Sequence, residues 1–308
     1  MIVASIDIGS NTALLLIADV DIKNKSMHTV VDKLSMPRIS KGLAAGSKIP
    51  DENLLKLYTV LDEYSQIIKF HKCEFVYASA TNAFRIAENS AEIVQEIKRV
   101  FNLNLEIIDG ETEALYSYFG ATSLNKSNKE CFVIDIGGGS TEIISGNGGK
   151  INFRKSLPLG VVSMSEKYFA TQPPNAAEIE MAREEISSIL SDKLPNNLNS
   201  ALSIAVAGTP TTLSAIKLGL KDFDADKIEC SVLRRDDIDK LIIQISHMTK
   251  EELLTEFGNV IQGREDLLLA GTIILKQIID QQNIKEINVS TRGLRHGIII
   301  SKLFGTKG

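Results

Sequence analysis

The sequence FVIDIGGGSTEIISG, from Phe132 to Gly146, runs an apolar segment into one aspartate, three consecutive glycines and Ser-Thr-Glu, and then returns to apolar residues. A similar order occurs near the start, in IVASIDIGSNTALLLIADV, residues 2 to 20. The aspartates of the two stretches, Asp7 and Asp135, lie 128 residues apart, a spacing that suits two similar domains better than a short repeat. A single copy would be explained equally well by a hairpin that turns on glycine.

The composition is that of an ordinary globular protein. The chain has 308 residues, 44% of them hydrophobic, and a net charge of −5, which suits two domains and argues against a surface that coats nucleic acid. Asp7 interrupts the first apolar run, so we expect neither a signal peptide nor a membrane span, and a cytoplasmic location. Cys73, Cys131 and Cys230 stand far apart without a CxxC pair, which argues against a zinc site or a disulfide framework.

The periodicity of apolar residues predicts the same order of elements twice. The first half is expected to contain strands at 2–7, 13–20, 27–34, 74–78 and 105–108, helices at 51–69 and 91–100, and a further helix from about Glu111. The second half is expected to contain strands at 131–136, 141–145, 150–157, 202–206 and 286–289 and helices at 176–190, after 207, within 236–282 and at 294–304. Ser90 is expected to cap the helix at 91–100, and Asn175 with Glu178 predicts a capping box for the helix at 176–190.

Each half therefore predicts a mixed sheet covered by helices, in an α/β chain with two similar domains and a ligand cleft between them. The polar stretch SLNKSNK, residues 123–129, is the expected boundary. Domain I is expected to span residues 1–124 and domain II residues 125–308, and the C-terminal helix, 295–308, is expected to pack back on domain I.

The glycine turns suit an anion. Bare backbone at Gly9 and at Gly137, Gly138 and Gly139 lets phosphate oxygens approach successive N–H groups. Hydroxyl donors follow in both turns, at Ser10, Thr12, Ser140 and Thr141.

The acidic residues beside the turns suit a cation. Asp135 and Glu142 lie on opposite arms of the second hairpin, so both can face one Mg²⁺, which prefers one or two carboxylates plus water and phosphate oxygens. Asp7 is the corresponding aspartate of the first hairpin. The four histidines are isolated and predict no competing metal site.

The chain closely resembles the exopolyphosphatase and guanosine-pentaphosphate phosphatase family, in its short two-domain form. That family has the ribonuclease-H-like fold shared with actin, heat-shock chaperone ATPases and sugar kinases. Eight segments carry the resemblance, in the family's order: DIGSNT (7–12), PRISKGL (37–43), ATNAFRIAEN (80–89), DGETEA (109–114), DIGGGSTE (135–142), SLPLGVVSMSEKYF (156–169), AGTPTT (207–212) and STRGLRHG (290–297).

The resemblance implies a hydrolase that releases the terminal phosphate of polyphosphate, or alternatively the 5′ phosphate of guanosine pentaphosphate. It implies Glu113 as the general base, with Glu111 as the nearby rival, and Arg85 as a catalytic phosphate ligand. It places Mg²⁺ or another divalent cation at Asp135, Glu142 and Asp7. The phosphate-binding positions that it implies are Gly9, Ser10, Asn11, Thr12, Arg38, Gly137, Gly138, Gly139, Ser140, Thr141, Gly208 and Thr209.

The expected ligands are polyphosphate and guanosine pentaphosphate or tetraphosphate, with no nucleic acid and no membrane partner. Arg292, Arg295 and Lys302 are candidates for a basic path along a long polyanion, although for Lys302 the preferred interpretation is a solvated helix face. Two other functions stay open on the same fold: an ATP-dependent kinase for a small acceptor, and an actin-like filament or nucleotide sensor. The sequence does not decide between a monomer and a homodimer.

Overall fold

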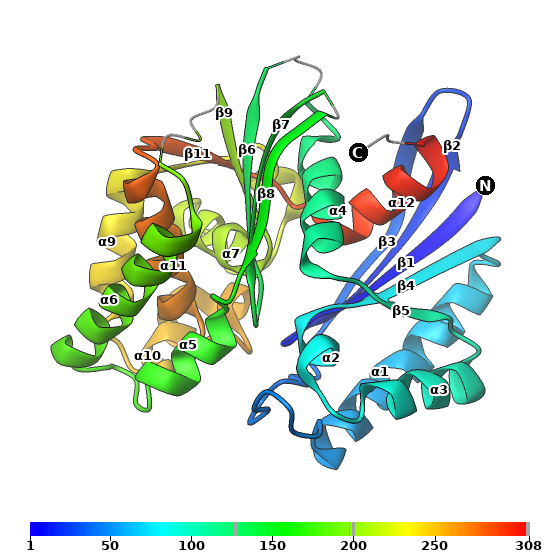
Figure 1. Ribbon diagram of the computed structural model, residues 1–308, viewed down its shortest axis with the longest axis horizontal. Helices are drawn as coiled ribbons and strands as arrows, with labels where there is room; N and C mark the ends of the chain where they lie inside the picture. Colours follow the sequence, from blue (N-terminus) through cyan, green and yellow to red (C-terminus); the bar gives the residue numbers. More distant parts are fainter. Residues whose placement is uncertain (126–128, 149, 197, 199–200, 306–308) are drawn as a thin grey trace. The chain divides into compact units, whose positions relative to one another are not determined.

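The computed structural model describes all residues except 126–128, 149, 197, 199–200 and 306–308. The chain divides into two compact units, each built around its own sheet (Figure 1). The first unit consists of Met1–Gly120 and Leu294–Gly308, and the second of Ala121–Gly293. The expected boundary, between residues 124 and 125, lies four residues beyond this division.

The first unit contains a five-stranded mixed sheet in the order β3-β2-β1-β4-β5. β1 pairs antiparallel with β2 and parallel with β4, β2 pairs antiparallel with β3, and β4 pairs parallel with β5. The strands are β1 (Ile2–Ile8), β2 (Ala13–Asp21), β3 (Ser26–Ser35), β4 (Phe75–Ala80) and β5 (Leu105–Ile107). The helices are α1 (Asp51–Phe70), α2 (Asn82–Ile86), α3 (Ser90–Phe101), α4 (Gly110–Thr122) and, from the end of the chain, α12 (Leu294–Phe304).

Helices cover both faces of this sheet because its strands are apolar on both sides. Leu57, Leu61 and Tyr64 of α1 join one buried cluster with side chains of β1 and β2. Ile299 of α12 joins a second cluster with Val3 and other residues of the same two strands. α12, from the end of the chain, therefore packs on the sheet of the first unit (Figure 1).

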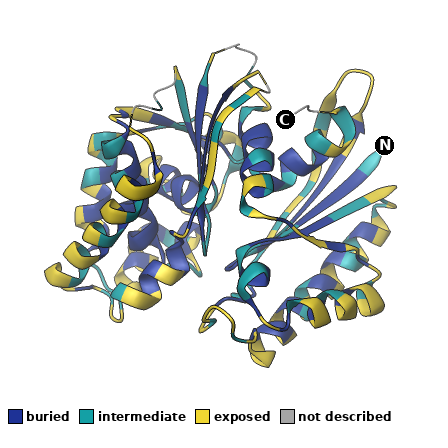
Figure 2. Cartoon of the chain, in the orientation of Figure 1, coloured by how far each residue is buried: buried dark blue, intermediate teal, exposed yellow. Residues whose placement is uncertain are grey.

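The second unit contains a six-stranded sheet in the order β10-β11-β9-β6-β7-β8. Its strands are β6 (Cys131–Ile136), β7 (Thr141–Asn147), β8 (Lys150–Leu157), β9 (Leu202–Val206), β10 (Val232–Arg234) and β11 (Glu286–Val289). Its helices are α5 (Val161–Tyr168), α6 (Ala176–Lys193), α7 (Gly208–Lys217), α8 (Ala225–Ile228), α9 (Arg235–Ile245), α10 (Lys250–Phe257), the 3₁₀ helix η1 (Gly258–Ile261) and α11 (Leu268–Gln281). Most of α11 is buried, as its dark blue ribbon in Figure 2 shows.

The two sheets share one plan. An antiparallel three-strand meander (β1-β2-β3 and β6-β7-β8) is extended on the side of its first strand by parallel strands, β4 and β5 in one unit and β9 and β11 in the other. The predicted two-domain α/β fold with similar halves is confirmed.

Local signals were less reliable than the overall pattern. The expected cap, Ser90, is already the first residue of α3; Asn89 precedes it and makes no side-chain cap. The Asn89 amide instead exchanges hydrogen bonds with the backbone of Ile49, because a buried amide needs partners. The capping box of Asn175 and Glu178 at the start of α6 is confirmed. The short elements α2, α5, α8 and β10 were not predicted.

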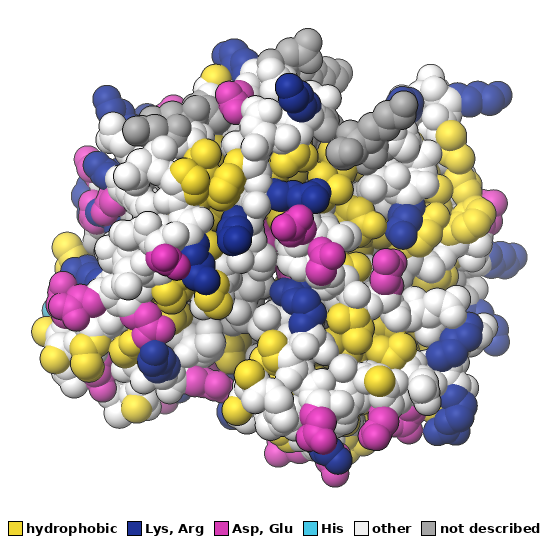
Figure 3. All heavy atoms as spheres, viewed as in Figure 1, with side chains coloured by type: hydrophobic (Ala, Val, Ile, Leu, Met, Phe, Trp, Pro, Cys, Tyr) yellow, Lys and Arg dark blue, Asp and Glu magenta, His cyan; other side chains and the backbone are white. Residues whose placement is uncertain are grey.

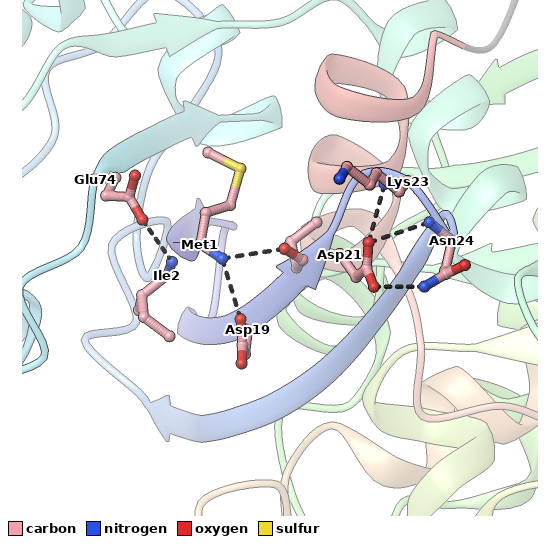
Figure 4. Close-up of polar contacts among 8 residues, drawn as sticks. Met1, Ile2, Asp19, Asp21, Lys23, Asn24 and Glu74 are labelled. Atoms are coloured by element: carbon pink, nitrogen blue, oxygen red, sulfur yellow. Dashed lines mark hydrogen bonds and ion pairs between the residues drawn. The ribbon is translucent and has the colours of Figure 1, made fainter.

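The start of β1 is held by polar contacts (Figure 4). The ammonium group of Met1 lies 3.2 Å from an Asp19 carboxylate oxygen and donates to the Val20 carbonyl, while the Ile2 N–H donates to Glu74. In the β2–β3 turn, Asn24 donates to Asp21 through its backbone and its side chain, and these bonds lower the pKa of Asp21.

Among the described residues, no helix combines the length and apolar character needed to cross a bilayer.

Candidate functional site

The two glycine turns have the same internal hydrogen bond. The Gly9 N–H donates to the Thr12 carbonyl at 2.8 Å, and the Gly137 N–H donates to the Ser140 carbonyl at 2.9 Å. The first turn joins β1 to β2 and the second joins β6 to β7, so both lie at the same point of the shared plan. Because these two N–H groups close their own turns, the donors for an anion must come from the residues that follow.

In the second unit, the start of α5 determines which way the turn peptides face. The N–H groups of Val161 and Val162 donate to the carbonyls of Gly137 and Gly138, at 3.0 and 2.8 Å. In a planar trans peptide the next N–H points opposite to the carbonyl. The N–H groups of Gly138 and Gly139 therefore point away from α5, and neither has a protein acceptor among the described residues. Two successive N–H groups of this kind form an anion-binding concavity.

The first turn is held in the same way by the segment that follows β3. The N–H of Arg38 donates to the Asn11 carbonyl and that of Ser40 to the Ser10 carbonyl, both at 3.0 Å. The N–H groups of Asn11 and Thr12 therefore point away from this segment. Arg38 itself has φ +51°, in the left-handed region that side chains rarely adopt, a strain that tends to accumulate at functional sites.

Gly160 shows how closely α5 approaches the second turn. A Cβ at this position would lie 2.2 Å from the Gly138 carbonyl oxygen and 2.3 Å from the Gly139 Cα, so no side chain fits. The Thr141 hydroxyl donates to the Leu159 carbonyl at 2.5 Å and ties the same loop to β7. This hydroxyl is therefore engaged in holding the turn.

The acidic pair of the second unit lies side by side on one face of the sheet. Asp135 and Glu142 are direct partners in the β6–β7 ladder, and Ser156 of β8 is the next partner of Glu142. Glu142 is completely buried, and the Ser156 hydroxyl donates to its Oε1 at 2.7 Å. Two adjacent carboxylates with an oriented oxygen fit a divalent cation that completes its shell with water and phosphate oxygens.

The first unit lacks this pair. Asp7 is opposite Leu14 in the β1–β2 ladder, where the second unit has Glu142 opposite Asp135. Within the described parts of the chain, no three Asp, Glu, His or Cys side chains form a ligand cluster. The assignment of Asp7 as a metal ligand stays a prediction.

Glu113 and Arg85 are brought together in the first unit. The side chain of Asp109 accepts the Thr112 N–H at the start of α4. Glu113, the next residue, is only 8% exposed, whereas Glu111 is exposed. The Arg85 Nη1 atom, from α2, lies 2.6 Å from the Glu113 Oε2 atom and 3.0 Å from the Ile108 carbonyl oxygen. Arg85 thus holds the Glu113 carboxylate in one orientation.

A positively charged side chain from a distant segment packs against the start of α7, and the sequence did not predict it. The guanidinium group of Arg264 packs against Gly208, where an added Cβ would lie 3.1 Å from its Cζ, and its Nη1 donates to the Thr212 hydroxyl at 2.8 Å. Burial lowers the pKa of Arg264. The Thr209 side chain packs closely against Gly271 of α11. Only the backbone of Thr209 is therefore left to bind a phosphate. Only the folded chain brings residues 208 and 264 together, so no local sequence signal reveals this contact.

Two of the three residues of the expected basic path have acidic partners. Arg295 is paired with Asp32 at 2.7 Å and Lys302 with Glu106 at 3.5 Å, both inside the first unit. Arg292 belongs to the second unit. On the face drawn in Figure 3, basic and acidic side chains are interspersed.

Two units that share one sheet topology match the actin-like ATPase fold. The chain belongs to the Ppx/GppA phosphatase family, whose model matches residues 17–305. It is 29% identical to Exopolyphosphatase 2 of Mycobacterium tuberculosis over 314 aligned residues, which cover 97% of this chain and 98% of the relative.

Solved structures agree with this placement. The Ppx/GppA family member of Aquifex aeolicus matches with a TM-score of 0.82 and 29% identity, covering 100% of this chain and 99% of its own. An exopolyphosphatase from Cytophaga hutchinsonii matches with a TM-score of 0.88 and 25% identity, over 100% and 99% of the two chains.

Proposed function

We propose that this chain is an exopolyphosphatase, which hydrolyses the terminal phosphoanhydride bond of inorganic polyphosphate. Membership of a phosphatase family supports the reaction class, and the names of the Mycobacterium and Cytophaga relatives support the substrate. A cytoplasmic location, without a membrane or nucleic-acid partner, belongs to the same proposal.

In the proposed reaction, Glu113 orients a water molecule and takes its proton as the oxygen attacks the terminal phosphorus. A P–O bond to the water oxygen forms and the anhydride P–O bond breaks. The products, orthophosphate and a polyphosphate shorter by one phosphate unit, leave the site. The proton passes from Glu113 to solvent. Arg85 fixes the carboxylate through the contact of 2.6 Å.

The substrate phosphates are proposed to bind the outward N–H groups of Gly138 and Gly139 in one unit and of Asn11 and Thr12 in the other. The hydroxyls of Ser10 and Ser140 and the guanidinium of Arg38 would add donors. Preorganised N–H groups of this kind stabilise charge without reorganising during the reaction.

A divalent cation, Mg²⁺ in the first place, is proposed to bind Asp135 and Glu142, with Asp7 as the candidate from the first unit. When bound, it would offset the repulsion between these carboxylates and the phosphates and draw charge from the phosphate oxygens. The orientation of Glu142 by Ser156 supports this assignment.

The observation that carries the proposal is the burial of Glu113 against Arg85 at the first turn of α4. Its test is the release of orthophosphate from long polyphosphate by the purified chain with Mg²⁺. We expect Glu113→Gln to lower kcat by about 10²- to 10⁴-fold, the usual contribution of a general base. Glu111→Gln is the matched control, because Glu111 is exposed on the same helical turn. Equal activity of the two variants would exclude Glu113 as the base.

A second substrate, guanosine pentaphosphate, is favoured by Arg264 at Gly208, a cation in the second unit additional to its glycine turn. Phosphate release from long polyphosphate, short polyphosphate and guanosine pentaphosphate should be compared in the same buffer. If Arg264 serves a nucleotide substrate, Arg264→Gln should lower kcat/KM for guanosine pentaphosphate by at least about tenfold more than for polyphosphate. An equal effect on both substrates would remove this support.

A further inference from the structure

Gly297 of α12 lies against the backbone of α4. A Cβ built on Gly297 would be 1.7 Å from the Tyr116 carbonyl oxygen and 2.5 Å from the Tyr116 carbonyl carbon. Real Cβ atoms do not approach other atoms below 3.0 Å, and here the obstacle is helix backbone, which has no rotamer to change. Any side chain at position 297 must therefore push the two helices apart by about 1 Å or more.

Backbone conformation does not explain why a glycine stands at position 297. It lies inside α12, and glycine in a helix interior is about 1 kcal/mol less favourable than alanine. Its φ is not in the left-handed region. The close contact with α4 is the feature that requires it, because two helix backbones can approach this closely only where one has no side chain.

The contact also reaches both members of the Glu113–Arg85 pair. Tyr116 is three residues after Glu113, about one turn along the same helix. Tyr116 packs in a small buried cluster with Ile108, Leu294 and Ile298. The Ile108 carbonyl in turn accepts a hydrogen bond from Arg85. α12 therefore supports the helix that carries the carboxylate and the residue that anchors the guanidinium.

We propose that Gly297 is a positioning residue for catalysis: it sets the separation of α12 and α4 and thereby the place of the Glu113 carboxylate. This inference rests on the proposed role of Glu113 as the base. It gives a function to the STRGLRHG segment, whose arginines the site does not explain. A misplacement of about 1 Å in a reacting group lowers a rate by about 10²-fold.

The test is a double-mutant cycle of Gly297→Ala and Glu113→Gln, with kcat measured on polyphosphate and expressed per folded protein from thermal melts. Gly297→Ala alone should lower kcat by about 10²-fold and change KM by less than about threefold. In the Glu113→Gln background the same change should lower kcat by less than about threefold, because a base that is already absent cannot be misplaced. If Gly297→Ala lowers kcat by the same factor with Glu113 and with Gln at position 113, its effect does not act through Glu113, and the proposal is overturned.

Gly293→Ala is the matched control. It makes the same substitution four residues earlier, where the added Cβ would lie 4.0 Å from Val206, an ordinary contact. We expect its kcat to stay within about twofold. A loss equal to that of Gly297→Ala would show that the segment is merely sensitive to substitution, and would overturn the proposal.

A milder variant covers the case in which Gly297→Ala does not fold. Leu294→Ala removes packing from the cluster around Tyr116 without a clash. It should lower kcat by at least about threefold when Glu113 is present, and it should not change the kcat of the Glu113→Gln variant. Multiplicative losses here would also contradict the proposal. Full activity of Glu113→Gln on its own is a different result: it removes the base assignment itself, and with it the basis for a positioning role.

Discussion

The Ser156 hydroxyl donates a hydrogen bond of 2.7 Å to Oε1 of Glu142, which is fully buried in the middle strand of its meander. Groups that orient a metal-binding carboxylate typically affect metal affinity by about 10- to 100-fold. We therefore expect Ser156→Ala to weaken Mg²⁺ binding at least about tenfold in calorimetric titrations of EDTA-treated protein. Ser187→Ala, on the exposed face of α6, is the control and should bind as the unmodified chain does. Equal affinities in all three would place the cation elsewhere.

Gly160→Ala should disrupt the second glycine turn. The added Cβ would meet the Gly138 carbonyl oxygen at 2.2 Å, so the turn or α5 must move and the N–H groups of Gly138 and Gly139 would lose their alignment. We expect KM for polyphosphate to rise by at least about tenfold. A KM within about twofold of the original, in a folded variant, would show that these donors do not bind substrate.

Arg85→Met should destabilise the fold by about 3 kcal/mol, because it leaves the buried Glu113 carboxylate without the guanidinium at 2.6 Å. Glu113→Gln in the same chain should recover a large part of that loss, since an amide has no charge to bury. Urea unfolding of the four combinations measures the coupling directly. Additive free-energy changes would mean that solvent, rather than Arg85, stabilises the carboxylate.

Alkaline pH should weaken the first unit through Tyr64. Burial raises the pKa of Tyr64 to about 12, and its hydroxyl donates to the Ala13 carbonyl at 2.7 Å. Below about pH 10 the phenol is protonated in both states; between about pH 10 and 12 the unfolded chain loses the proton first, so stability falls as pH rises. At about pH 11 the loss from this group should be about 1 kcal/mol.

Urea unfolding near pH 9 and near pH 11 checks this expectation. Tyr64→Phe has no phenol to ionise and should lose about 1 kcal/mol less than the unmodified chain over that interval. Tyr58→Phe is a useful comparison, because burial also raises the pKa of Tyr58 and its removal should act in the same direction. An identical pH response in the Tyr64→Phe variant would contradict the assignment.

The duplicated fold was readable from the sequence because strand alternation and glycine turns are local patterns. Asp135 and Glu142 stand seven residues apart on the two arms of one hairpin, so the sequence alone predicts that they lie side by side. The cap was wrongly predicted at Ser90, which is the first residue of α3. The Asn89 side chain, which precedes it, does not cap the helix because it is bound to the buried backbone of Ile49, 40 residues away. α5 was missed because its eight residues are too few for a clear helical period.

Contacts between distant segments could not be inferred in this way. The sequence does not tell that Arg264 packs on Gly208, or that Gly297 meets Tyr116. The family resemblance selected Glu113 and Arg85 separately, and the structure adds that the two side chains touch. It also shows that Arg295 and Lys302 each pair with an acidic residue that lies far away in sequence.

Leu14 occupies the ladder position in the first unit that Glu142 occupies in the second, although both turns close with the same backbone hydrogen bond. At this point of the two units the main-chain geometry is the same and the side-chain chemistry differs. A superposition of the two turns would therefore match positions 14 and 142, which a comparison of residue identities alone would leave unmatched.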